Sequence, residues 1–256
     1  MKPLKILFIF LFLPLVVFAD NQPWKVYKST HFLISYKSAK DSQLDALASK
    51  AEEYYNKITE DLGFNRFDFW TWNNRARIYL FDDQQEYMRV TGDPVWSAGE
   101  AQIGSKLIQT FITAKGFLDD ILPHEMGHII FREMVGFNNS GVPLWLDEGV
   151  ACFQQERVAF DKAHLANKIR GGTSLSLNDL NRIVTMHSKT ETEADLFYSE
   201  AYNLVKYLIT EFGKDRFVLF CQNLRDKKDL SRALTMTYSF NGMADFESAW
   251  KKYILK

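Results

Sequence analysis

The spacing of hydrophobic residues changes repeatedly over the first half of the chain, and it predicts strands alternating with helices. Residues 24–36 alternate loosely between apolar and polar positions, which is typical of one strand or a strand pair. Apolar residues then recur every three or four positions over 44–62, and Gly63 follows. We therefore expect a helix that Asp41 or Ser42 caps and the glycine ends.

Two further apolar runs, residues 76–81 and 106–113, are predicted strands, and residues 84–90 between them form a predicted short helix. Together these elements make a small mixed α/β half over residues 20–116. No repeat or low-complexity segment interrupts it.

From residue 117 onwards the pattern is almost wholly helical. A helix is predicted from about Asp119 to Val135, with Pro123 in its first turn or at a kink, because proline has no backbone N–H to donate. The apolar side of this helix is expected to consist of Leu122, Met126, Ile129, Ile130 and Met134. Further helices are predicted at about 157–169, 193–212, 214–224, 228–238 and 243–255, with loops at Gly171–Thr173 and His187–Glu193.

A second helix of this half is predicted after a turn at Asn138–Gly141, with Pro143 opening it and its end near Gln155. The small residues Gly149 and Ala151 would let it approach the preceding helix closely, or they only ease packing elsewhere. The whole pattern predicts an α+β fold, in which the small mixed half packs on a mainly helical half over residues 117–256.

The first 19 residues have the features of a secretory signal peptide. Lys2 and Lys5 precede an apolar run from Ile6 to Phe18, and Ala19 ends the segment. The run is shorter than the roughly 20 residues that a membrane-spanning helix needs, although an uncleaved anchor is the alternative. We expect export to the periplasm or the exterior, a mature domain over residues 20–256, and no stable membrane anchor after cleavage.

Composition and charge indicate a globular domain and argue against nucleic-acid binding. The chain has 256 residues, 46% of them hydrophobic, which is enough for a substantial core. The formal net charge of −1 becomes −3 when Lys2 and Lys5 leave with the signal peptide, so no basic excess remains for binding nucleic acid. Cys152 and Cys221 could form one disulfide in an exported protein or remain two buried thiols.

The strongest chemical signal is the run His-Glu-Met-Gly-His at residues 124–128. Residues four apart on a helix lie one above the other, so His124 and His128 can present two imidazoles to one metal ion. Glu125 is turned about 100° around the axis and can reach a water molecule on that metal without being a ligand. It is the natural general base.

A third metal ligand is expected from Glu148, nineteen residues after the run, within Trp-Leu-Asp-Glu-Gly-Val-Ala. Catalytic zinc takes three protein ligands of nitrogen or oxygen type and leaves one position open for water. Two histidines and a carboxylate meet that requirement. Neither cysteine has a second cysteine or histidine at the short spacing of a thiolate zinc site.

The motif and the distant glutamate together resemble the gluzincin metallopeptidases, and among them the peptidase MA-like domain family. Weaker similarities lie in Thr30–Tyr36, Phe197–Tyr202, Tyr207-Leu208, Phe212-Gly213 and Phe246–Trp250. The resemblance implies a Zn²⁺ site formed by His124, His128 and Glu148, with Glu125 as catalytic base. It also implies a gluzincin-like zincin fold, with the site in a cleft between a mixed sheet and a helical bundle.

The resemblance also implies a side chain that hydrogen-bonds the oxyanion, and Tyr198 matches the family position best. Tyr202 is the reserve, and His164 and His187 are further alternatives. Gluzincin aminopeptidases carry a Gly-x-Met-Glu-Asn pattern whose glutamate holds the free amine of the substrate. Here Glu100 follows a glycine but lacks the flanking methionine and asparagine, which favours an endopeptidase.

These features predict an exported zinc metallopeptidase that hydrolyses peptide bonds in a peptide or protein substrate. The strand at 106–113, if it lies at the cleft edge, could pair with the extended substrate. The alternatives are a catalytically silent binding or scaffold protein of the same fold, and a zinc hydrolase acting on another amide or ester. The intact Glu125 argues against the silent protein, because binding alone needs no carboxylate at that position.

Overall fold

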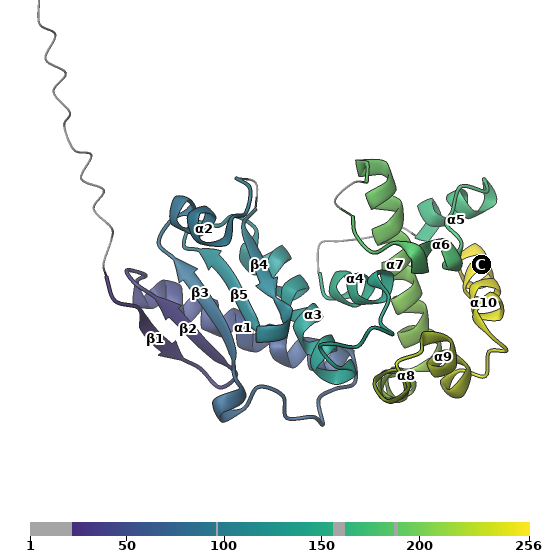
Figure 1. Cartoon of the computed structure of the whole chain (residues 1–256), viewed down its shortest axis with the longest axis horizontal. Helices are drawn as coiled ribbons and strands as arrows, with labels where there is room; N and C mark the ends of the chain where they lie inside the picture. Colours follow the sequence, from purple (N-terminus) through teal and green to yellow (C-terminus); the bar gives the residue numbers. More distant parts are fainter. Residues whose placement is uncertain (1–21, 96, 156–161, 187–188) are drawn as a thin grey trace, which may run out of the picture.

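The structure is a computed structural model of the chain, and it describes residues 22–95, 97–155, 162–186 and 189–256. The predicted signal peptide at residues 1–19 lies outside these residues. A five-stranded sheet occupies one end of the molecule and a group of helices the other, with helix α3 (Leu122–Val135) between them (Figure 1). This arrangement confirms the predicted α+β class.

The sheet has the strand order β1-β2-β3-β5-β4. Strands β2 (Phe32–Tyr36), β3 (Ala76–Phe81) and β5 (Leu107–Phe111) run parallel, and β1 (Lys25–Lys28) and β4 (Gly99–Gln102) flank them antiparallel. Residues 24–36 are therefore a strand pair, and the predicted strand at 76–81 has the observed bounds. Strand β4 was not predicted, because its four residues are too short to establish an alternating pattern.

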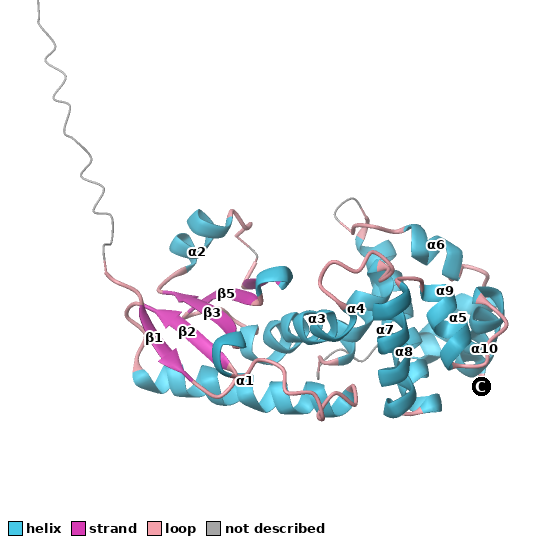
Figure 2. Cartoon of the chain, turned by 60° about the horizontal axis from the view of Figure 1, so that its bottom comes forward, coloured by secondary structure: helices cyan, strands magenta, loops and turns pink. Residues whose placement is uncertain are grey.

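One face of the sheet packs on the long helix α1 (Asp41–Asp61), and the short helix α2 (Gln84–Thr91) lies over the other face (Figure 2). Burial alternates along the first part of β3. Ala76, Ile78 and Leu80 are buried, while Arg77, between the first two, is exposed. Side chains at alternate positions of a strand point to the same face of the sheet, so the buried residues share one face. The predicted N-cap of α1 is wrong. Lys40 occupies the cap position, and the Gln43 side chain satisfies its backbone N–H at 2.9 Å.

Helices α3 and α4 (Leu144–Phe153) begin the helical half, and a short π-helical segment at Phe117–Ile121 leads into α3. The remaining helices are α5 (Lys162–Arg170), α6 (Leu177–Arg182), α7 (Glu191–Phe212), α8 (Lys214–Lys227), α9 (Leu230–Thr237) and α10 (Met243–Leu255). The sequence pattern missed α6, which is six residues long. Pro123 lies in the first turn of α3, as predicted.

One large hydrophobic core runs through both halves, from Phe32 on the sheet to Ile254 on α10, and a small second cluster of Phe81, Tyr87 and Phe111 lies under α2. The predicted apolar side of α3 is part of the large core, and its five residues are each at most 2% exposed. Cys152 and Cys221 are both buried free thiols, so the disulfide alternative is not realised. Within the described parts of the chain, no helix combines the length and apolar character needed to cross a membrane.

Candidate metal centre

Helix α3 presents the two motif histidines to one point. Because they are four residues apart, their rings lie on one face, and their Nε2 atoms are 3.2 Å apart. Pro123 in the first turn and the left-handed Gly116 before the π-helical segment set the direction in which the chain enters this helix.

Helix α4 adds the carboxylate. Oε2 of Glu148 lies 3.5 Å from Nε2 of His124 and 3.6 Å from Nε2 of His128. The three side chains therefore converge, as the motif and the nineteen-residue gap had led us to expect.

Small residues allow the two ligand-bearing helices to approach each other. A Cβ atom at Gly127 would lie 3.0 Å from the Cα atom of Ala151, so this is the tight crossing between α3 and α4. For Gly149 the second alternative holds, packing elsewhere. Its added Cβ would lie 2.4 Å from the backbone oxygen of Ala201, which places it against α7.

The turn between α3 and α4 is fixed by Asn139. Its Nδ2 atom donates to the backbone oxygens of Val135 at 2.8 Å and Leu224 at 3.0 Å, and its Oδ1 atom accepts from the Gly141 backbone N–H at 2.9 Å. Through Leu224 the turn is joined to the end of α8. The two helices that carry the three donors therefore have a defined relative position.

The donor set fits zinc. Zinc bonds to nitrogen and oxygen of about 2.0–2.2 Å place the donors of a tetrahedral site roughly 3.3–3.6 Å apart. The three observed separations are 3.2, 3.5 and 3.6 Å. Zinc would bind at this point if both Nε2 atoms are unprotonated, because only then do all three donors direct a lone pair to the same ion. Among the described residues, these three form the one group of histidine, cysteine and acidic side chains with such geometry.

A second layer of residues, which the sequence reasoning missed, supports His128. Its Nδ1 atom lies 3.2 Å from Oδ1 of Asp147, and Arg132 donates to Oδ2 of the same aspartate at 2.7 and 2.9 Å. Burial would raise the pKa of Asp147, but His128 and Arg132 outweigh it and hold that pKa below its usual value. The sequence held a signal, because Arg132 follows His128 by four residues and so shares its helix face.

Glu125 is next to the metal donors and partly shielded from water. Burial raises its pKa above the usual value, while the two neighbouring histidines act in the opposite direction. A carboxylate with a raised pKa is a better proton acceptor at neutral pH than an ordinary glutamate. The position and the environment of Glu125 therefore suit a general base.

Tyr198 lies on α7, the helix that packs most extensively on α4. Its pKa is raised, first by burial and then by the charges of Glu148, Cys152 and Glu125, so its hydroxyl stays protonated and able to donate. Tyr202, one turn further along, packs its ring 6.2 Å from that of Phe153. Tyr198 is electrostatically coupled to both Glu125 and Glu148.

Glu100 also comes close to the centre. It lies on β4, the edge strand, and its pKa is raised by burial, by Asp93 and by Glu125. Strand β5 is paired on both sides, so it is not free to pair with an extended substrate as the sequence had suggested. The edge strand is β4, and helix α3 packs on it.

The remaining sequence candidates lie elsewhere. His164 is exposed on α5, and His187 falls outside the described residues.

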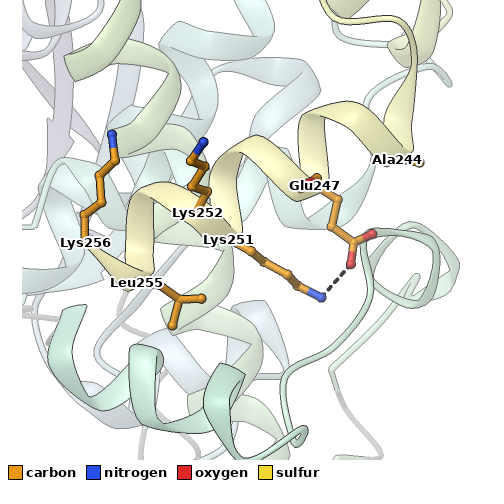
Figure 3. A pocket seen from close by; sticks show the side chains of 7 residues that line it. Ala244, Glu247, Lys251, Lys252, Leu255 and Lys256 are labelled. Atoms are coloured by element: carbon orange, nitrogen blue, oxygen red, sulfur yellow. Dashed lines mark hydrogen bonds and ion pairs between the residues drawn. The ribbon is translucent and has the colours of Figure 1, made fainter.

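A surface hollow of about 720 Å³ runs along α10, where Glu247 points toward Lys251 and pairs with it at 2.6 Å (Figure 3). None of its lining residues belongs to α3 or α4, so this hollow is separate from the histidines.

Comparison with known proteins gives one family. The sequence model of the Peptidase MA superfamily matches residues 73–256, which include the motif and Glu148. No curated protein matches the chain.

Solved structures that resemble the chain include two of yeast LTA4 hydrolase, one native and one in complex with bestatin. They are 15% and 13% identical, with TM-scores of 0.46 and 0.48 over 90% and 91% of the chain. A mutant of an M1 zinc metallopeptidase from Deinococcus radiodurans is 11% identical, with a TM-score of 0.47 over 89% of the chain. The chain spans 38%, 39% and 51% of the lengths of these proteins.

Proposed function

Because the chain belongs to the Peptidase MA superfamily, we propose that it is an exported zinc-dependent peptidase and that it cleaves within peptide chains. The observation that carries the proposal is the set of donor atoms from His124, His128 and Glu148, 3.2 to 3.6 Å apart, with Glu125 beside them. Export is inferred from the first 19 residues of the sequence.

Nε2 of each histidine and a carboxylate oxygen of Glu148 would hold the zinc ion. When bound there, zinc would supply Lewis acidity, lowering the pKa of water and stabilising negative charge. Glu125 takes the proton from the attacking water and later passes it to the leaving amine, a transfer that its raised pKa favours. The Tyr198 hydroxyl donates a hydrogen bond to the oxygen of the substrate carbonyl as negative charge develops on it.

Strand β4 would align the substrate. It is antiparallel to β5 and leaves its other edge unpaired within the sheet, next to α3. An extended peptide could add to this edge through backbone hydrogen bonds, which give affinity with little sequence preference.

An aminopeptidase is the second candidate, and Glu100 favours it. This carboxylate lies on β4 close enough to Glu125 for their charges to interact, where it could meet a positively charged amine. Paired substrates with a free or an acetylated N-terminus separate the two activities. Cleavage of both supports the endopeptidase, and cleavage of the free form alone supports the aminopeptidase.

The decisive experiment measures metal content and degradation of an unfolded protein substrate together. Glu125→Gln should keep zinc and lose nearly all cleavage, because the ligands remain while the base is gone. His124→Ala should lose both, whereas His164→Ala, at an exposed histidine, should lose neither. Equal cleavage by wild type and Glu125→Gln would refute the mechanism, and zinc without cleavage in the wild type would favour a binding protein.

A further inference from the structure

The outward-facing nitrogens of the two metal-site histidines have different surroundings. Nδ1 of His128 faces the carboxylate of Asp147 at 3.2 Å. Nδ1 of His124 is buried and makes no hydrogen bond to any part of the chain that the structure describes. A buried polar atom without a partner is unusual and calls for an explanation.

Gln155 lies just after the end of α4, and its amide reaches the backbone of Asp120, four residues before His124 on the segment that leads into the same helix. This contact places the amide next to the turn of helix that carries His124. Burial lowers the pKa of His124, whereas Glu148, Glu125 and Gln155 raise it. The Nε2 atom of Gln155 donates to the backbone oxygen of Asp120 at 3.1 Å. Because a carbonyl oxygen only accepts, this bond fixes which end of the amide is nitrogen and leaves Oε1 as the end free to accept.

We propose that Gln155 is a positioning residue for the metal site, with its Oε1 atom accepting the Nδ1 proton of His124 once Nε2 binds the ion. This hydrogen bond holds the tautomer in which Nε2 carries no proton and is free to act as a ligand. The inference rests on the proposed zinc site and deepens it.

Gln155 also joins the ligand to the segment before the motif helix. Asp120, which accepts from its amide, belongs to the π-helical segment Phe117–Ile121 that leads into α3. One side chain thus links His124 to the start of its own helix, and α4 supports both histidines, with Asp147 near its start and Gln155 after its end. The support of His124 is neutral, whereas that of His128 is a carboxylate neutralised by Arg132.

The test is the zinc affinity of the full chain, measured by competition with a chelator for wild type and three variants. Gln155→Leu, which keeps the shape but removes the acceptor, should weaken zinc binding about 10- to 100-fold. Gln155→Glu keeps an acceptor oxygen for His124 but loses the donor to Asp120, so it should bind zinc more tightly than Gln155→Leu does. Gln85→Leu, at an exposed glutamine on α2, is the matched control and should bind as the wild type does.

A Gln155→Leu affinity equal to that of the wild type would overturn the inference and leave the zinc site intact, whereas a wild type without zinc would overturn both. A second measurement needs no variant. In the zinc-bound wild type, the Nδ1 proton of His124, observed by ¹⁵N-edited NMR of the histidine side chains, should be protected from exchange. Exchange as fast as at the exposed His164 would refute the hydrogen bond.

Discussion

Oδ1 of Asp147 lies 3.2 Å from Nδ1 of His128, while the next residue on α4 faces Nε2 of the same ring at 3.6 Å. Two consecutive carboxylates therefore contact opposite sides of one imidazole. Asp147 accepts from the ring and from Arg132, and Glu148 is left for the metal. The division follows from charge, because Arg132 pairs with only one of the two.

Replacing Asp147 with alanine should weaken zinc binding about 10- to 100-fold, because His128 loses the partner that orients it. It should also lower the free energy of unfolding of the metal-free protein by about 3 kcal/mol, because Arg132, only 16% exposed, is left without its counter-ion. Chelator competition and urea denaturation in EDTA measure the two effects. Affinity and stability both equal to wild type would contradict the role of this contact.

Gly149→Ala should destabilise the protein by about 1–3 kcal/mol, because the added Cβ would lie 2.4 Å from the Ala201 backbone oxygen and force α4 away from α7. Glu148 would move with α4, so zinc affinity should also fall. Gly104→Ala is the matched control, since a Cβ there meets no atom within 4 Å. Equal melting temperatures for the two variants would show that the helices can separate at no cost.

Tyr198→Phe should lower kcat about 100- to 1000-fold and leave KM and zinc content nearly unchanged, because the lost hydroxyl acts on charge that develops only in the transition state. Tyr202→Phe, one turn away on α7, should retain near wild-type kcat. Steady-state kinetics with a fluorogenic peptide measures both. A larger loss in Tyr202→Phe would transfer the role to that residue.

Glu200 gives a prediction for pH. Burial raises its pKa to about 8, and one of its oxygens accepts from the Leu175 backbone N–H at 2.9 Å, while the other has no hydrogen-bond partner in the described part of the chain. Lys251 lowers this pKa and Glu247 raises it. The folded state keeps the proton up to about pH 8, whereas the unfolded chain loses it near its usual value of 4.5.

The stabilising contribution of the protonated group is therefore complete below about pH 4.5 and is lost as the pH rises to 8. Relative to Glu200→Gln, the wild type should lose at most about 1.4 kcal/mol of stability per pH unit in this range. Urea denaturation of both proteins at several pH values measures the difference. Parallel stability curves would show that Glu200 ionises in the folded protein as it does in the unfolded chain.

The sequence predicted those parts of the site whose geometry is local. His124 and His128 share a helix face because of their spacing, and Pro123 lies in the first turn, one of the two places that its missing N–H allowed. The strand at Ala76–Phe81 was predicted with its exact bounds, since alternation of burial on a sheet leaves a clear pattern.

The parts that failed depend on contacts distant in sequence. Gly149 packs against Ala201 of α7, which no local pattern reveals. Strand β4 is recognisable only by its pairing with β5. Because of this pairing, the edge strand of the sheet is β4 and not β5. Gln155 approaches His124 only because α4 folds back along α3.

The bonds of Asn139 have a consequence for the energetics of metal uptake. Since its amide joins the connection between α3 and α4 to the Leu224 carbonyl, loosening α8 would also disturb the spacing of the donors. By linkage, an ion that binds only the correctly spaced donors must resist that loosening. Saturation with zinc should therefore slow amide hydrogen exchange in the last turn of α8, around Leu224. This helix supplies none of the three ligands.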